Sequence, residues 1–168
     1  MTLSRRGFLA FGTAALMLSG CSSVGVKPAP EDDGGITPAE LNPAVIANAI
    51  NGTRKKNHVP ALSYSNTLER AARAMANLMA ERNTISHTLG GTLRQRVNAV
   101  DYHGAVGENL AVGYDTLEGA IDGWLKSPGH RSTLLNVKFS EFGLAAARGP
   151  RGVFWAFIAG GDIAAWRT

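Results

Sequence analysis

Residues 107–112 read GENLAV and residues 117–131 read LEGAIDGWLKSPGHR, and these two segments are the most informative about the fold. Within the first part, residues 109–112 fit a short strand. The second part has apolar residues three and four positions apart, which is the spacing of one helix face: Leu117, Ala120, Ile121, Trp124 and Leu125. The Ser-Pro-Gly sequence at 127–129 favours a helix end. This stretch therefore predicts a strand followed by an amphipathic helix.

Two further strands are expected near the C-terminus. Residues 142–147 and 153–159 are largely apolar and flank Arg148-Gly149-Pro150-Arg151-Gly152. Glycine and proline at these positions favour a hairpin turn. The last third of the chain is therefore predicted to be an antiparallel hairpin.

Helical patterns dominate the residues before residue 107. Apolar residues recur at helix spacing between 68 and 79, at Leu68, Ala71, Ala72, Met75, Leu78 and Met79. A shorter helix is expected through residues 45–50, after a capping-box pattern at 37–40 or a start at Asn42-Pro43, and another at 93–100. Helices first and a hairpin last predict an α+β domain, a three-layer α-β-α sandwich on an antiparallel sheet.

Residues 1–20 have the pattern of a signal peptide. Arg5 and Arg6 precede an apolar run that ends in small residues. The segment 7–20 is shorter than the ~20 helical residues that cross a bilayer, which argues against a permanent span. Ser4-Arg5-Arg6-Gly7-Phe8-Leu9 resembles the twin-arginine export motif, the alternative being a chance arginine pair in an ordinary secretory signal.

Leu18-Ser19-Gly20-Cys21 resembles the bacterial lipobox. It predicts cleavage before Cys21, acylation of the Cys21 thiol and anchoring to a membrane by acyl chains such as palmitate. Residues 21–36, rich in Ser, Gly, Pro and acid, are expected to be a flexible linker to a domain at 37–168. The expected location is the cell envelope, on the extracytoplasmic side.

Cysteine count and charge restrict the mature protein further. Cys21 is the only cysteine, so the domain can form no disulfide. Loss of residues 1–20 removes Arg5 and Arg6 and no acidic residue, which lowers the formal charge from +4 to +2. So small an excess argues for neither nucleic acid nor an anionic membrane as a charge-selected partner.

Four pieces of sequence carry a family resemblance, in order along the chain. The first is the early helix and loop from Ala49 to Leu62, which lead into the long helix and then Ile85-Ser86-His87. The others are Gly107-Glu108-Asn109-Leu110-Ala111, the segment from Trp124 to Arg131 followed by Leu134-Leu135-Asn136, and Phe139-Ser140-Glu141-Phe142-Gly143. Over roughly residues 42–160 the chain resembles a bacterial CAP (SCP-like) domain. The resemblance implies an α-β-α sandwich with a cleft that holds two histidines and acidic residues.

The resemblance also suggests site residues. His87 matches the first histidine of the family's cleft, Glu108 its first glutamate and His130 its second histidine. Ser127 stands where the larger tetrad has a second glutamate, which puts full tetrad chemistry in doubt. His87 and His130 are therefore candidate ligands for zinc or another divalent cation.

The residue types allow this chemistry and also a simpler reading. Imidazole titrates near neutral pH and is a common transition-metal ligand, and a carboxylate beside it can fix the ring tautomer. Alternatively, His87 caps the preceding helix and Glu108 accepts hydrogen bonds from buried backbone N–H groups. His58 and His103 match no motif and are expected to be loop residues.

Three functions remain open at this point. The preferred one is a binding module whose cleft takes a metal, an apolar or lipid ligand, or a segment of an envelope protein. The second is a hydrolase in which a zinc-bound water is activated by Glu108, but neither a nucleophile elbow nor a helical His-Glu-x-x-His motif is present. The third is a structural envelope domain with no active cleft.

Overall fold

One sheet of four strands forms the centre of residues 37–167, the part of the chain that this computed structural model describes. The strands are β1 (Ser63–Tyr64), β2 (Ala105–Val112), β3 (Glu141–Gly149) and β4 (Gly152–Gly161), in the spatial order β1-β3-β4-β2. The predicted signal peptide (1–20), Cys21 and the linker (21–36) lie outside the described residues, as does residue 168.

The predicted hairpin is confirmed, whereas the prediction of a purely antiparallel sheet is wrong in one detail. β3 and β4 pair antiparallel and meet at Gly149 and Gly152, where the φ of +105° at Gly152 suits glycine. β1, however, pairs with β3 in parallel. A parallel pair needs a long crossover, and residues 65–140 supply it here. The sheet is therefore mixed.

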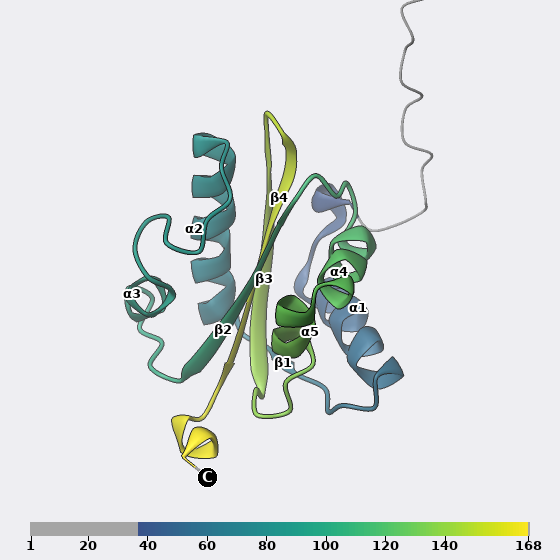
Figure 1. Cartoon of the computed structure of the whole chain (residues 1–168), viewed down its shortest axis with the longest axis vertical. Helices are drawn as coiled ribbons and strands as arrows, with labels where there is room; N and C mark the ends of the chain where they lie inside the picture. Colours follow the sequence, from purple (N-terminus) through teal and green to yellow (C-terminus); the bar gives the residue numbers. More distant parts are fainter. Residues whose placement is uncertain (1–36, 168) are drawn as a thin grey trace, which may run out of the picture. The chain divides into compact units, whose positions relative to one another are not determined.

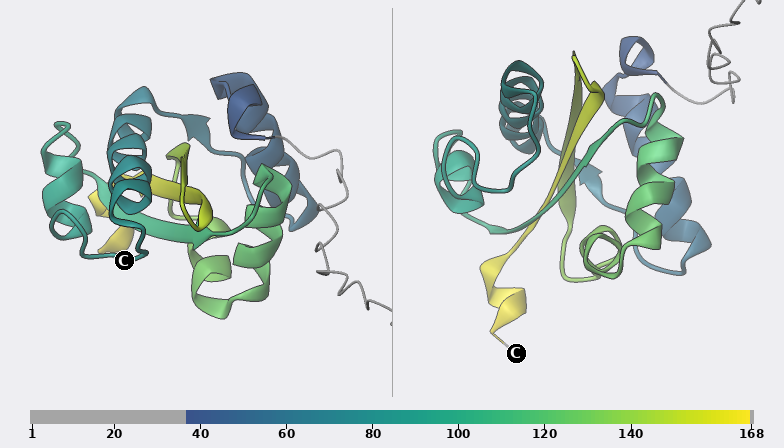
Figure 2. Two further views of the ribbon diagram at one scale, coloured as in Figure 1. Left: turned by 90° about the horizontal axis from the view of Figure 1, so that it is seen from above. Right: turned by 45° about the horizontal axis from the view of Figure 1, so that its top comes forward.

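Helices cover both faces of the sheet (Figure 1 and Figure 2). α2 (Asn66–Arg82) and α3 (Leu93–Asn98) lie on one face, and α1 (Pro43–Lys56), α4 (Leu117–Lys126) and α5 (Pro128–Leu134) lie on the other. Two short 3-10 helices, η1 (Pro38–Glu40) and η2 (Ile163–Trp166), flank these layers in the sequence. The predicted α-β-α sandwich is confirmed. Within residues 37–167 no helix has the length and apolarity needed to cross a bilayer.

Alternating side chains of the sheet build two separate cores. On β4, Phe154 and Ile158 pack with the apolar face of α2, whereas Trp155 and Phe157 pack with α1 and α4. All four side chains are fully buried. Side chains alternate between the two faces of a strand, so one strand serves both cores. The described residues contain no cysteine, so the layers are joined by packing without a disulfide.

The same alternation operates on β2, which forms one edge of the sheet. Val106 and Leu110 belong to the core beside α2, while Ala111 belongs to the core on the opposite face. Glu108 therefore points to the α2 side and its neighbour Asn109 to the α5 side. Two adjacent polar residues of one motif thus act on opposite layers of the domain.

A buried arginine joins α1 to α5. Arg54 is fully buried, and its guanidinium donates hydrogen bonds to three backbone carbonyls: Pro60 O at 2.7 Å, Leu134 O at 2.6 Å and Asn136 O at 3.1 Å. Burial lowers the pKa of Arg54 from its usual value. Arg131 on α5 adds an exposed bond of 2.8 Å to the Asn57 side chain. These bonds fix the position of α5 relative to α1.

Candidate functional site

His87 is held by a buried carboxylate. Its Nδ1 lies 2.9 Å from Glu108 Oε2, and the other carboxylate oxygen accepts a hydrogen bond from the Arg96 guanidinium. The Glu108 side chain is 2% exposed and that of Arg96 is 8% exposed, while 58% of the His87 side chain is exposed. The exposed imidazole therefore rests on an ion pair that is almost wholly removed from water.

Arg96 also fixes the segment that carries His87. A second nitrogen of its guanidinium donates to His87 O at 2.8 Å and to Gly91 O at 2.7 Å. Arg96 lies on α3, and the segment joins α2 to α3. One side chain thus positions both the carboxylate and the backbone of the histidine that the carboxylate contacts.

The ion pair also determines the tautomer of His87. Glu108 is ionised beside Arg96 and can only accept hydrogen bonds. The proton must therefore reside on Nδ1 of His87, and in the neutral ring Nε2 keeps its lone pair. A carboxylate behind a histidine is the usual arrangement that orients an imidazole toward a metal ion or another electrophile.

His130 approaches from the opposite layer. It lies on α5, and its backbone carbonyl accepts a 2.8 Å hydrogen bond from Asn109 Nδ2. Burial lowers the pKa of the His130 imidazole from its usual value, and the nearby His87 lowers it further. The ring of His130 is consequently neutral at neutral pH, with a lone pair free for a ligand.

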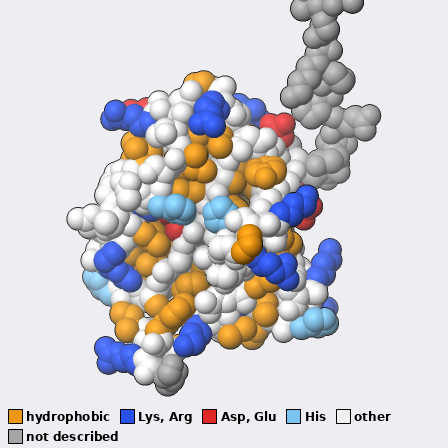
Figure 3. All heavy atoms as spheres, viewed as in Figure 1, with side chains coloured by type: hydrophobic (Ala, Val, Ile, Leu, Met, Phe, Trp, Pro, Cys, Tyr) orange, Lys and Arg blue, Asp and Glu red, His pale blue; other side chains and the backbone are white. Residues whose placement is uncertain are grey.

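The two histidines meet beside the edge strand β2. Burial is the larger cause of the lowered His130 pKa, and the second cause, the effect of His87, requires the two side chains to be close. In Figure 3, two histidine side chains lie side by side on the viewed face, between the regions of α3 and α5. The Glu108-Asn109 pair serves both, one residue for each layer. Segments 43 positions apart in sequence thus present two imidazoles on one surface.

Ser127 occupies the junction of α4 and α5. Ser127 is the C-cap residue of α4 and also the N-cap residue of α5. Its side chain makes no capping hydrogen bond to α5. Within residues 37–167 its hydroxyl contributes no hydrogen bond to His87, Glu108 or His130. It does not replace a second glutamate in this arrangement.

The simpler reading of His87 and Glu108 is wrong. α2 ends at Arg82 and its C-cap is Asn83, whose φ of 49° is left-handed, so His87 does not cap it. Glu108 accepts from the side chains of His87 and Arg96 instead of from backbone N–H groups. Of the remaining histidines, His103 is an exposed loop residue 2.9 Å from Asp101, and His58 follows the end of α1.

Two ring nitrogens are the donors that this site could offer to a divalent transition metal. Residues 37–167 contain no group of three or more His, Cys, Asp or Glu side chains that could hold a metal ion. Both Glu108 oxygens are engaged, which leaves Nε2 of His87 and the ring of His130 as donors. A closed structural zinc site takes four protein ligands, so these two suit an open site in which water or a bound molecule completes the shell.

Arg96 was not found from the sequence. A glutamate within an otherwise apolar strand requires a cationic partner when it is buried, and this is the signal that was available. The helix predicted at 93–100 contains both Arg94 and Arg96. Only the folded arrangement separates them, since Arg94 donates to Gly104 O at 2.8 Å and Arg96 reaches Glu108.

Two bacterial proteins are among those with similar sequences. The chain is 34% identical over 101 residues to a protein of Borreliella burgdorferi and 29% identical over 102 residues to the protein YkwD of Bacillus subtilis, each match covering 59% of this chain. The matches cover 64% and 40% of those two proteins, so the chain spans less than two thirds of either.

Solved structures give the same picture. An extracellular SCP-domain protein of Bacillus anthracis matches with a TM-score of 0.64 and 27% identity over 70% of this chain and 39% of that protein. An outer surface protein of Borrelia burgdorferi matches with a TM-score of 0.63 and 28% identity over 71% of this chain and 91% of the other. The model of the cysteine-rich secretory protein family, CAP, matches residues 47–159. On this match, which includes every residue of the site, the chain belongs to the CAP family.

Proposed function

We propose that this chain is an extracytoplasmic binding domain that takes a divalent transition-metal ion, such as zinc, between His87 and His130. The observation that carries the proposal is a pair of neighbouring imidazoles with free ring nitrogens. The His87 ring is held by Glu108, and His130 is positioned through its backbone by Asn109. Two protein ligands leave coordination positions for a donor from a ligand, such as a lipid headgroup or a segment of an envelope protein.

The geometry favours binding over hydrolysis. A metallohydrolase needs a base that can take a proton from the attacking water. Glu108 has one oxygen on His87 and the other on Arg96, so neither is available for that task. Turnover of ester or peptide substrates that disappears in His87→Ala at unchanged thermal stability would make the hydrolase the better hypothesis.

Calorimetry of the full chain with Zn²⁺ tests the metal site. Wild type should bind at about pH 7.5 and more weakly at about pH 5.5, because protons compete for imidazole lone pairs around the usual pKa. His130→Ala should weaken binding by at least about tenfold, because mutating even a residue that only hydrogen-bonds to a metal ligand costs about that much affinity. His103→Ala is the control, since His103 is an exposed histidine paired with Asp101. Equal losses in both variants would exclude a specific site at His130.

The location and the anchor are part of the same proposal. Relatives include an extracellular protein and an outer surface protein, and the sequence 18–21 resembles a lipobox. Cys21→Ala should abolish incorporation of labelled palmitate and release the protein from membranes, since each buried methylene of an acyl chain contributes about 0.8 kcal/mol. Ser22→Ala is the matched control and should label normally.

Changing Arg5 and Arg6 to Lys should leave the precursor in the cytoplasm if export follows the twin-arginine route.

A further inference from the structure

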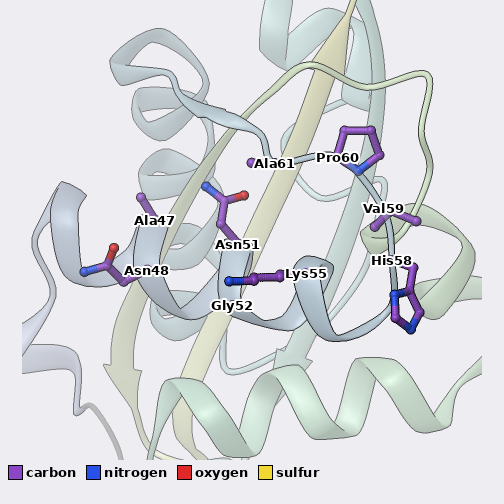
Figure 4. A pocket seen from close by; sticks show the side chains of 9 residues that line it. All are labelled: Ala47, Asn48, Asn51, Gly52, Lys55, His58, Val59, Pro60 and Ala61. Atoms are coloured by element: carbon purple, nitrogen blue, oxygen red, sulfur yellow. The ribbon is translucent and has the colours of Figure 1, made fainter.

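A separate cavity of about 630 Å³ lies between α1 and the segment that follows it (Figure 4). α1 forms one wall and residues 58–61 form the other. The residues that line it are Ala47, Asn48, Asn51, Gly52, Lys55, His58, Val59, Pro60 and Ala61. Neither His87 nor His130 is among them, so this cavity is distinct from the candidate metal site.

Hydrogen bonds hold the two walls of the cavity together. The amide of Asn51 bonds both backbone groups of Leu62, donating to its carbonyl at 2.9 Å and accepting from its N–H at 2.8 Å. Behind the wall, buried Arg54 donates to Pro60 O at 2.7 Å. Such bonds hold residues 58–61 against α1 without a ligand. The cavity is therefore pre-formed, as small-molecule sites usually are.

Several residues that line this cavity carry exposed hydrogen-bond donors without protein partners. The Lys55 ammonium, the His58 ring, the Asn48 amide and the Ala61 N–H bond to no other group among residues 37–167. No aspartate or glutamate lines the cavity. A set of donors with one fixed positive charge and no carboxylate selects a ligand that carries several acceptor oxygens and a negative charge.

A phosphate group has these properties, namely several acceptor oxygens and a negative charge. A lysine ammonium binds phosphate as a point charge, and the remaining donors can share its other oxygens. Ala47, Val59 and Pro60 offer apolar contact to a compact body, and the Asn48 amide can bond a hydroxyl. We infer that this cavity is a second ligand site, for the phosphate ester of a small polyol, either free or as the headgroup of a phospholipid.

The neighbouring lysine provides a matched control. Lys56 lines a different hollow, together with Glu118 and Asp122 of α4. Acidic side chains thus line the hollow beside Lys56, whereas none lines the cavity beside Lys55. Lys55→Ala and Lys56→Ala remove the same charge from adjacent positions of one helix, so general electrostatic attraction would weaken in both variants alike.

Calorimetry of the full chain with glycerol 1-phosphate, and with glycerol as the uncharged comparison, tests the inference at physiological ionic strength. Wild type should bind the phosphate and not glycerol. Lys55→Ala should weaken binding by about tenfold or more, the value of one hydrogen bond to a charged group. Lys56→Ala and His87→Ala should bind like wild type. Because His87→Ala removes the candidate metal ligand, its normal binding separates this inference from the proposed function.

A second arm identifies the source of the phosphate. The Cys21→Ala chain, which cannot be acylated at that position, is floated with vesicles of phosphatidylglycerol or of phosphatidylcholine. Lys55-dependent flotation with phosphatidylglycerol, without binding of glycerol 1-phosphate, would support the headgroup. Absence of binding in both arms, or equal weakening by Lys55→Ala and Lys56→Ala, would overturn the inference.

Discussion

His87 and His130 reach the same edge of the sheet from opposite layers, but the groups that hold them differ in charge. His87 rests on the Glu108–Arg96 ion pair, whereas His130 is positioned through its backbone by the neutral amide of Asn109. A buried ion pair is costly to break, because the remaining charge has no solvent. An amide–carbonyl hydrogen bond contributes less to stability, and its removal costs less free energy. The two halves of the site should therefore respond differently to mutation and to pH.

The largest effect is expected on the His87 side. Glu108→Gln keeps the side-chain shape but leaves the Arg96 guanidinium buried without an anion, which should lower the free energy of unfolding by about 3–5 kcal/mol. Urea unfolding followed by circular dichroism measures this. The double variant Arg96→Met with Glu108→Leu should recover most of the loss while His87 loses its support. A loss below about 1 kcal/mol in Glu108→Gln, the range of exposed pairs, would contradict a desolvated pair.

A smaller effect is expected on the His130 side. Asn109→Ala removes the donor to His130 O and should cost about 1–2 kcal/mol. The change should shift the NMR signals of the His130 ring and leave those of the His87 ring unchanged. The reason is that Asn109 and Glu108, which hold the two histidines, point to opposite faces of the sheet. Equal disturbance of both rings would show that the halves of the site are not separable.

The smallest effect is the dependence of stability on pH. Because the pKa of His130 is lowered in the folded state, first by burial and then by His87, the unfolded chain takes up the proton first. The stabilisation from this residue is complete above the unfolded pKa of about 6.5 and is lost as pH falls through the folded pKa. In thermal melts, the stability of wild type relative to His130→Gln should fall as pH decreases across this range. Parallel pH curves for the two proteins would contradict the assignment.

The sequence predicted the layers well because they depend on local periodicity. The spacing of apolar residues from Leu68 to Met79 corresponds to α2, and the Gly-Pro turn corresponds to the β3–β4 hairpin. Pairing across the fold could not be read in this way. β1 is two residues long and has no periodicity to detect, and its partner β3 begins at residue 141. Its parallel direction was therefore missed.

The site shows the same division. The motif sequences singled out His87, Glu108 and His130, and the structure brings them to one edge of the sheet. The helix α5 was not predicted, because Ser127-Pro128-Gly129 was interpreted only as the end of α4. Proline is also favoured at the first position of a helix, and Pro128 has that role in α5. Whether a Ser-Pro-Gly sequence ends one helix or also begins the next depends on the tertiary packing of the residues that follow it.

The carbonyl contacts of Arg54 also set an order on folding. Leu134 and Asn136, which accept two of its hydrogen bonds, follow it by 80 and 82 positions in the chain. Closing a segment of that length carries a large entropy cost before any contact is gained, and contacts of high sequence separation slow folding. The N-terminal helix α1 thus contains a charge that cannot be satisfied until residues 134–136 have been synthesised. This domain cannot complete its N-terminal layer first while the rest of the chain is still on the ribosome.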